Sequence, residues 1–318
     1  MQVQLLVPEL NDAVDDYGIE DHRRLTTVRL GNSGIFFELM IYGGALGAKR
    51  PLVILNSIDF AMPPPETFCR LMWQHDFQVI FIRRSGFGLS TPLPDRLMNK
   101  RSIANGATAV TEAVLVNQLL LQSELRGIIL LGFGSATPVC SRLSTLSPNI
   151  KLTILSNPVF NSDIVDVFRP AWFQMVLKQV LSTRTGIFFA EAGIKHQLKR
   201  NPMKFYLQVA QKSAGDIKFI EENEADIWAA SLVTQDITAL TMYYDTYMSL
   251  RKDSFLKDRM FEPINIVALS GEETSVSWRS GFLSECHRLG LPPVFAPSGD
   301  MFAPYQSPET LLSIIANN

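Results

Sequence analysis

The sequence predicts an α/β fold with a doubly wound, mostly parallel sheet and a helical segment inserted into it. Apolar runs of strand length alternate with helical stretches, and each connection is long enough for a right-handed crossover. Two of the runs, PLVILNS and FQVIFI, are almost wholly apolar, which is typical of strands buried on both faces of a parallel sheet. Residues 158–235 show helical periodicity instead, and the strand pattern resumes after them.

Each predicted element follows from a local pattern. Residues 1–24 are polar and aperiodic, so they predict an irregular arm without a signal-peptide pattern. Residues 25–44 predict two strands, because β-branched and aromatic residues flank an Asn-Ser-Gly turn signal at Gly31–Gly34. The other predicted elements are, in chain order, the strand PLVILNS, a helix at Glu66–His75, the strand FQVIFI, a helix at Ile103–Leu125, the strand GIILLGF, a helix from Ser135 to about Leu146, the strand KLTILS, the helical segment 158–235, the strand INIVALSG, a helix near Trp278–Leu289, the strand PVFAP and a helix at Pro308–Ile315.

The inserted helical segment carries an apolar stripe at helical spacing. The stripe consists of Phe168, Trp172, Met175, Val176, Val180 and Leu181. We expect most aromatic side chains of the segment to pack internally and some to line a cleft above the sheet. The chain therefore divides into an arm of residues 1–24, an α/β core of residues 25–157 and 236–318, and a helical cap of residues 158–235.

Three stretches carry a resemblance to a known family. FQVIFIRRSGFGLS is similar to that family's fourth strand with its Gly-x-Gly-x-Ser loop, and PLVILNS to the third strand, which ends there in His-Gly. SGDMFAPYQSPETLLSII is similar to the closing segment, in which Gly-His precedes the Pro-Glu of the final helix. With the insertion after the sixth strand, residues 25–318 resemble the α/β-hydrolase fold with a cap domain. A fold by itself does not decide function.

The chemistry of that family needs a nucleophile, a base and an acid. The nucleophile stands on a tight turn between a strand and a helix, with small residues two positions before and after it. In GFGSA, Gly132–Ala136, this rule is met only with Gly134 at the centre, because a central Ser135 would put Phe133 at a cramped position. Glycine has no side chain with which to attack a substrate.

The resemblance places the other two catalytic positions at residues of the wrong type. The acid would stand at Thr274, in LSGEETSVS, and the base at Asp300, in PSGDMF. No histidine follows His287, so the base is missing however the closing segment is aligned. Asn56 and Ser57 replace the His-Gly of the oxyanion loop. Together these changes argue that the hydrolase reaction is lost.

Ser135 has two interpretations. It is a displaced nucleophile, or it is the N-cap of the next helix, since Ser followed by Pro138 in the first turn is a common helix start. We favour the cap. The histidines offer little as a base: they are His22, His75, His196 and His287. Only His196, in the cap, is placed to reach the cleft.

Several charged residues also have a functional and a structural interpretation. Asp300 is an acid of the pocket, or it caps the Ser-Gly-Asp turn. Glu272 and Glu273 are carboxylates near it, or they belong to a solvated turn, which the usual exposure of acidic residues favours. Arg83 and Arg84 bind a carboxylate or a phosphate at the edge of the sheet, or they form internal salt bridges.

The composition is that of a globular protein without a strong charge bias. Of 318 residues 47% are hydrophobic, and 29 Lys and Arg face 31 Asp and Glu, so we expect no nucleic-acid partner and no membrane partner. Cys69, Cys140 and Cys286 lack metal-ligand spacing and are expected to be reduced and buried. No apolar run approaches the ~18 residues that span a bilayer. We expect a cytoplasmic protein without metal or cofactor.

The sequence thus favours a catalytically degenerate protein that binds a small amphipathic molecule or a protein partner, as a sensor or regulator. Free N–H groups of the helix that begins near Ser135 would form the polar floor of the site. The expected ligand-binding residues are Asn56, Ser57, Gly134, Ser135, Asp300 and Trp172. The alternative is an enzyme, either an esterase that uses Ser135 or a lyase that uses Asp300 as base. A third possibility is a subunit that stabilises an active homologue, so a homo- or hetero-oligomer remains open.

Overall fold

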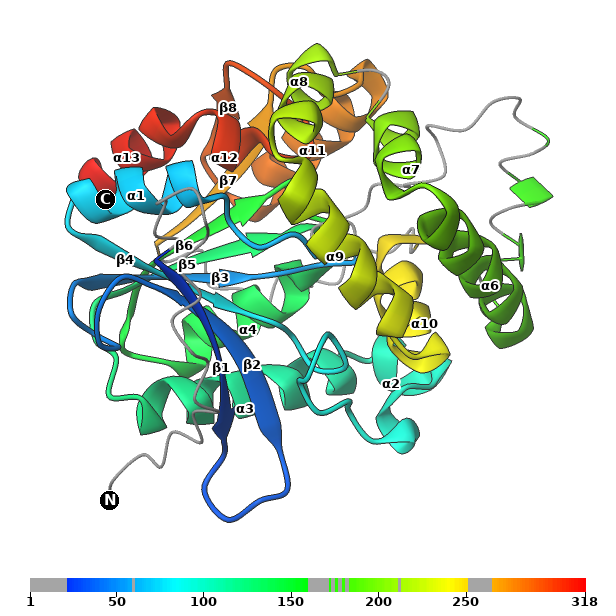
Figure 1. The fold of residues 1–318 in the computed structure, drawn as a ribbon, viewed down its shortest axis with the longest axis horizontal. Helices are drawn as coiled ribbons and strands as arrows, with labels where there is room; N and C mark the ends of the chain where they lie inside the picture. Colours follow the sequence, from blue (N-terminus) through cyan, green and yellow to red (C-terminus); the bar gives the residue numbers. More distant parts are fainter. Residues whose placement is uncertain are drawn as a thin grey trace, which may run out of the picture.

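The structure, a computed structural model, describes residues 22–58, 61–159, 172, 175–176, 179–180, 183–210, 213–250 and 265–318. Its centre is a single eight-stranded sheet in the order β1-β2-β4-β3-β5-β6-β7-β8 (Figure 1). Strand β2 pairs antiparallel with β1 and with β4, and all other pairs are parallel. The prediction of a mostly parallel, doubly wound sheet is confirmed. The strands are β1 (Arg23–Arg29), β2 (Phe36–Tyr42), β3 (Arg50–Leu55), β4 (Phe77–Ile82), β5 (Ile128–Phe133), β6 (Ile150–Ser156), β7 (Ile266–Gly271) and β8 (Pro293–Ala296).

Helices cover both faces of the sheet, because its central strands are apolar on both sides. Along β3, Leu52 and Ile54 face one apolar cluster with helices α1 and α13, whereas Val53 and Leu55 face another with α3, α4 and α11. Figure 1 shows α1 and α13 on the opposite side of the sheet from α3 and α4. The helices of the core are α1 (Glu66–Gln74), α2 (Lys100–Ala104), α3 (Ala107–Gln122), α4 (Thr137–Leu146), α11 (Val276–Leu289), α12 (Ala303–Gln306) and α13 (Pro308–Ala316).

The core helices differ from the prediction at three places. The helix predicted over Ile103–Leu125 is interrupted between α2 and α3, where Gly106 has a φ of 81°, a left-handed conformation that ends a helix. The helix predicted from Ser135 begins only at α4, after a 3₁₀ turn, η2 (Gly134–Ala136). The short helix α12 was not predicted.

The cap contains helices that begin at polar residues. Thr183, Asn201 and Ser213 each accept a hydrogen bond from a backbone N–H of the first turn that follows, which satisfies one otherwise unpaired donor. The sequence places the return to the core at residue 236; in the described residues α10 follows that position, and we count it with the cap because it packs against α6. The labelled helices of this part are α6 (Arg184–Arg200), α7 (Pro202–Val209), α8 (Ala214–Glu222), α9 (Glu224–Asp236) and α10 (Ala239–Leu250).

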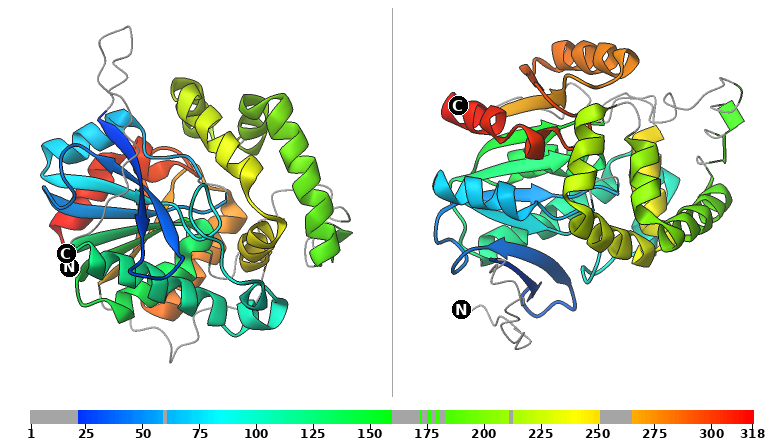
Figure 2. Two further views of the ribbon diagram at one scale, coloured as in Figure 1. Left: turned by 60° about the horizontal axis from the view of Figure 1, so that its bottom comes forward. Right: turned by 45° about the horizontal axis from the view of Figure 1, so that its top comes forward.

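The cap helices lie together at one end of the sheet (Figure 2), and two close approaches fix them there. In the loop after β4, a Cβ on Gly86 would lie 2.2 Å from Oγ1 of Thr241 in α10. In α8, a Cβ on Gly215 would lie within 2.8 Å of three side chains of the core. In α8 the ring of Phe219 also stacks on that of Phe302 at 4.8 Å. The surface of α10 that carries Thr241 therefore faces the end of the sheet.

The predicted apolar stripe of the cap is described only in part. Phe168 and Leu181 lie outside the described residues. The described members are exposed rather than packed, with exposed fractions of 65% for Trp172 and 69% for Met175. Phe189 of α6 is also 73% exposed, whereas Tyr206 of α7 is buried, so the expectation that most cap aromatics pack internally holds for only part of the described side chains. In the described part of the chain, no helix combines the length and apolar character that a membrane span requires.

Candidate functional site: a carboxylate of the cap at the elbow

The turn after β5 has the geometry of a tight corner between a strand and a helix. The φ of Gly134 is 45°, in the range that favours glycine. Two residues earlier, a Cβ on Gly132 would lie 2.3 Å from Sγ of Cys140, and two residues later Ala136 is fully buried. Small residues are therefore required on both sides of Gly134, which stands at the corner without a side chain. We call the turn Gly132–Ala136 the elbow.

Ser135 is not the N-cap that we predicted. It lies within η2, and the residue before α4 is Ala136, which has no capping side chain. The Ser135 hydroxyl is fully buried and donates a hydrogen bond of 2.5 Å to Oδ2 of Asp245 in α10. The prediction failed because Ser135 lies inside a 3₁₀ turn, so that α4 begins only two residues later, at Thr137.

Asp245 connects the cap to the ends of three strands of the core. Its Oδ2 accepts a hydrogen bond from the N–H of Ile58, after β3, at 3.0 Å, in addition to the one from Ser135, after β5. Its Oδ1 lies 3.2 Å from Nη1 of Arg84, after β4. In this type of fold, a backbone N–H from the loop after the third strand forms part of the oxyanion hole. The Asp245 carboxylate thus accepts a hydrogen bond from the N–H of Ile58, which belongs to that loop.

Arg84 is the cation of this network, and the core holds it in place. Glu112 of α3 accepts bonds from its Nε at 3.2 Å and its Nη2 at 2.8 Å, a bidentate pairing. Oδ1 of Asn56 accepts a bond from its backbone N–H at 2.8 Å. Burial alone would lower the pKa of the guanidinium, but Asp245 and Glu112 outweigh it and raise that pKa well above its usual value. Arg84 is fully buried and charged, and an internal salt bridge is thus the correct interpretation of this residue.

The other predicted site residues near the elbow are buried as well. Asn56 orients Arg84, and Ser57 is fully buried with a hydroxyl that has no hydrogen-bond partner within the described ranges. Arg83 also forms an internal salt bridge, at 3.0 Å between its Nε and Oε1 of Glu38. Trp172 is 65% exposed. All four histidines are exposed, and the three cysteines are free and buried.

A second polar cluster brings together the two other positions that the resemblance singled out. Oγ1 of Thr274, after β7, lies 3.0 Å from Oδ1 of Asp300. Nδ2 of Asn157, after β6, donates to the carbonyl oxygen of Asp300 at 2.5 Å and to its Oδ1 at 3.3 Å. Asn157 is in turn held by the hydroxyl of Ser270 at 2.8 Å. The acid and base positions are thus neighbours, but neither carries the side chain that the family's chemistry uses.

Two carboxylates bind the loop that carries Asp300, one from the cap and one from the core. Asp216 of α8 accepts the backbone N–H groups of Asp300, Met301 and Phe302 at 3.1, 2.7 and 3.2 Å. Glu273 accepts the N–H groups of Gly215 in α8 and of Gly299 at 2.9 and 3.2 Å. The solvated turn that we favoured for Glu273 is therefore wrong, because this carboxylate joins the core to the cap. Glu272 is exposed.

Burial and charge set the protonation of this second cluster. Burial, reinforced by the nearby charge of Asp216, raises the pKa of Asp300 to about 6. Burial also raises the pKa of Asp216, although four hydrogen bonds to its carboxylate act in the opposite direction. The pKa of Glu273 is lowered, because backbone N–H groups outweigh its burial. Asp300 is thus the acid of this cluster that changes charge near neutral pH.

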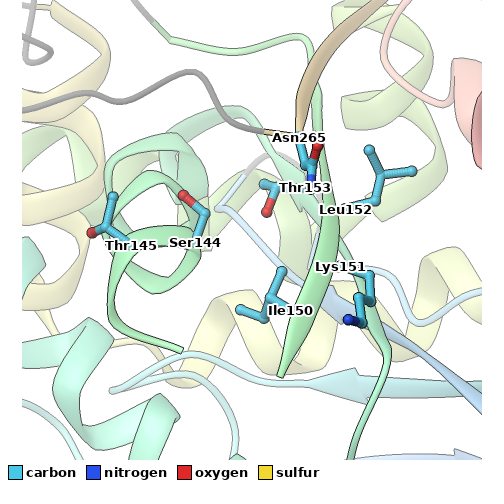
Figure 3. A pocket seen from close by; sticks show the side chains of 7 residues that line it. All are labelled: Ser144, Thr145, Ile150, Lys151, Leu152, Thr153 and Asn265. Carbon is cyan, nitrogen blue, oxygen red and sulfur yellow. The ribbon is translucent and has the colours of Figure 1, made fainter. Parts of the chain in front are cut away.

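Two surface pockets lie away from both clusters. The one in Figure 3, of about 250 Å³, is lined by the end of α4 and the beginning of β6, including Ser144, Lys151 and Asn265. The other, of about 470 Å³, lies beside β8 and α13 and includes Val294 and Glu309. Neither contains a residue of the elbow or of the loop at Asp300. In the described part of the chain, no group of His, Cys, Asp and Glu side chains has the arrangement of a metal site.

Comparison with known proteins identifies the fold. No protein-family model matches the chain, and no curated protein matches it in sequence. The epoxide hydrolase CorEH is similar in structure, with a TM-score of 0.61 at 15% identity over 93% of this chain and 97% of that one. A bromoperoxidase from Bacillus anthracis has a TM-score of 0.57 at 13% identity, over 92% and 100% of the chains.

The N-formylmaleamic acid deformylase from Pseudomonas putida S16 has a TM-score of 0.53 at 13% identity, over 92% of this chain and all of its own. Other similar structures are described as α/β hydrolases. This chain has the α/β-hydrolase fold. Identities this low establish the fold and leave the chemistry to the residues of the site.

Proposed function

We propose that this α/β-hydrolase-fold protein is not a hydrolase and that it acts as a binding or regulatory protein. The observation that carries the proposal is the state of the elbow: Gly134 stands at its corner, and Asp245 of the cap binds the hydroxyl of Ser135. The nucleophilic mechanism of this fold requires an accessible side chain at that corner.

The environment of Ser135 supports the proposal. An activated serine gives its proton to a base that is itself held by a third group, while its oxygen faces the substrate. Here Ser135 is fully buried, and its oxygen lies between Asp245 Oδ2 and, at 3.4 Å, Nη1 of Arg84. Nη1 of Arg84 also bonds Asp245. Both neighbours belong to a closed ion-pair network rather than to a proton relay.

Asp300 carries the alternative, an enzyme of the lyase type. With a pKa of about 6, its carboxylate would be ionised at neutral pH and close to the range in which a general base is effective. It is partly exposed. Its hydrogen bonds with Thr274 and Asn157 would orient it as a base.

The test is a panel of ester, amide and epoxide substrates, with carbon-acid substrates added for the lyase alternative. We expect no turnover above that of a Ser135→Ala, Asp300→Asn double variant. Turnover of the parent protein that one of the single variants abolishes would contradict the proposal and identify the residue responsible. The fold of each variant is checked by its thermal transition.

A further inference from the structure

The polar groups around Asp245 divide into donors from the core and one acceptor from the cap. The donors are the N–H of Ile58, the hydroxyl of Ser135 and Nη1 of Arg84. They follow β3, β5 and β4, the three central strands, at the end of the sheet where α/β folds bind their ligands. All three contact the carboxylate of Asp245, which belongs to α10 of the cap.

Arg84 has partners in the core besides Asp245. Arg84 is fixed by Glu112 of α3 and by Asn56, both of them core residues. Ile58 follows β3 closely, and Ser135 lies in η2 directly after β5. Removal of the Asp245 side chain would therefore leave a buried guanidinium edge, an N–H and a hydroxyl around an opening with the volume of one carboxylate.

We infer that the three donors at the elbow and the neighbouring strand ends form a binding site for a small monocarboxylate, and that Asp245 occupies it as an internal ligand. The inference rests on the proposed function, since a site that binds a carboxylate in this way does not use Ser135 as nucleophile. A free carboxylate reaches the donors only when Asp245 leaves them, so its binding is linked to the movement of α10 away from the elbow.

The charge of the network selects a monoanion. Glu112 already neutralises Arg84 in a bidentate pair, so the donors offer directional bonds but little excess positive charge. A dianion such as phosphate would lie near the Glu112 carboxylate without a second cation from the described residues of the network, and buried unpaired charge is costly. The planar geometry of a carboxylate also matches the one that Asp245 presents.

The experiment removes the internal ligand and supplies a free one. We would measure the thermal midpoint of Asp245→Ala against sodium formate and sodium acetate, with sodium chloride at equal ionic strength. The variant should unfold at a lower temperature than the parent. Formate should raise its midpoint by about 2 °C or more along a saturable curve, and chloride should not.

Two further variants serve as controls. In Ser135→Ala, Asp245→Ala one donor is missing, and the apparent affinity for formate should fall about tenfold. Leu311→Ala removes a fully buried side chain of α13 that has no part in the Asp245 network, and it should lower the midpoint without any response to formate. If Asp245→Ala does not fold without a ligand, it is refolded from denaturant with formate and with chloride, and the recovery of folded protein is the readout.

The outcomes separate this inference from the proposed function. Equal stabilisation by formate and chloride, or by neither, overturns the inference and leaves the proposed function untouched. Turnover in the substrate panel that depends on Ser135 overturns both. A saturable response to formate that weakens without the Ser135 hydroxyl supports the carboxylate site.

Discussion

Helices α10 and α8 both bring a carboxylate from the cap to the core, but the core neutralises the two carboxylates differently. Asp245 of α10 meets the guanidinium of Arg84. Asp216 of α8 meets three backbone N–H groups and the side-chain amide of Gln306, at 2.6 Å. The first contact is an ion pair, and the second is a carboxylate held by dipoles beside Asp300.

The difference predicts how each contact responds to change. An ion pair fails when one partner is removed, because the remaining charge is left buried. A carboxylate held by backbone dipoles has no cation to lose, but its burial makes its charge, and that of Asp300 beside it, sensitive to pH. The contact of α10 should therefore depend on side-chain identity, and the contact of α8 on pH.

The largest effect is expected from Arg84→Met. It leaves the carboxylates of Glu112 and Asp245 buried without their cation, and the free energy of unfolding should fall by about 3–5 kcal/mol. Urea denaturation measures this loss. The control is Arg288→Ala, which breaks a partly exposed pair with Glu285 and should cost at most about 1 kcal/mol. An equal loss of unfolding free energy in the two variants would contradict the claim that the buried network stabilises the fold more than a partly exposed ion pair does.

Asp216→Ala should have the next largest effect. It removes the acceptor of three backbone N–H groups in the loop at Asp300, and the free energy of unfolding should fall by about 2–3 kcal/mol. The loss is smaller than for Arg84→Met because no opposite charge is left unpaired. Amide hydrogen exchange of residues 300–302 should accelerate in this variant, and unchanged exchange would contradict the assigned contact.

The pH dependence of stability tests the α8 contact more closely. Because the pKa of Asp300 is raised to about 6 in the folded protein, its contribution to stability is complete below about pH 4 and is lost as the pH rises through about 6. The raised pKa of Asp216 acts with the same sign. The pKa of Glu273 is lowered, so its contribution to stability is present at neutral pH and is lost as the solution becomes acidic.

The variant Asp300→Asn should flatten this dependence, by an amount on the order of 1–2 kcal/mol between pH 4 and pH 7. Urea denaturation at successive pH values measures it. A parent protein whose stability rises over this interval, in parallel with the variant, would show that Asp300 is ionised at an ordinary pKa.

The smallest effects are expected at the two glycines of the cap contacts, and they should differ. Gly86→Ala puts a methyl group against Thr241 at a φ of 85° and should cost about 1–2 kcal/mol. Gly215→Ala meets three side-chain ends that hydrogen bonds hold in place, but it has no unusual φ and gains helix propensity in α8, so it should cost less, at most about 1 kcal/mol. Thermal midpoints compare the two, and a larger loss for Gly215→Ala would reverse the order we assign.

Most of the fold could be predicted because its signals are local. The apolar runs of β3, β4 and β5 identify buried strands, and the spacing of Gly132, Gly134 and Ala136 identifies a tight turn. The interruption at Gly106 was missed although the pair Asn105-Gly106 is a turn signal, because helical residues stand on both sides of it.

The site was predicted less well, because its contacts join residues far apart in the chain. Asp245 lies 110 positions from Ser135, and Asp216 lies 84 positions from Asp300. One signal was present: Glu112 in ATAVTEAVLVNQLLLQ and Asp245 in ALTMYYDTYMSL are each the only charged residue of their helix. A single acid in an otherwise uncharged helix indicates a buried charge with a partner, and Arg84 was available as that partner.

The most direct test of the central claim is the intact mass of the protein after exposure to a reactive fluorophosphonate, with Ser135→Ala beside it and an active serine hydrolase in the same reaction. If Gly134 leaves the elbow without a nucleophile and Asp245 holds Ser135, the mass of the parent protein stays unchanged while the hydrolase is modified completely. A single adduct on the parent that is absent from Ser135→Ala would contradict the claim, because it would show that Ser135 is accessible and activated.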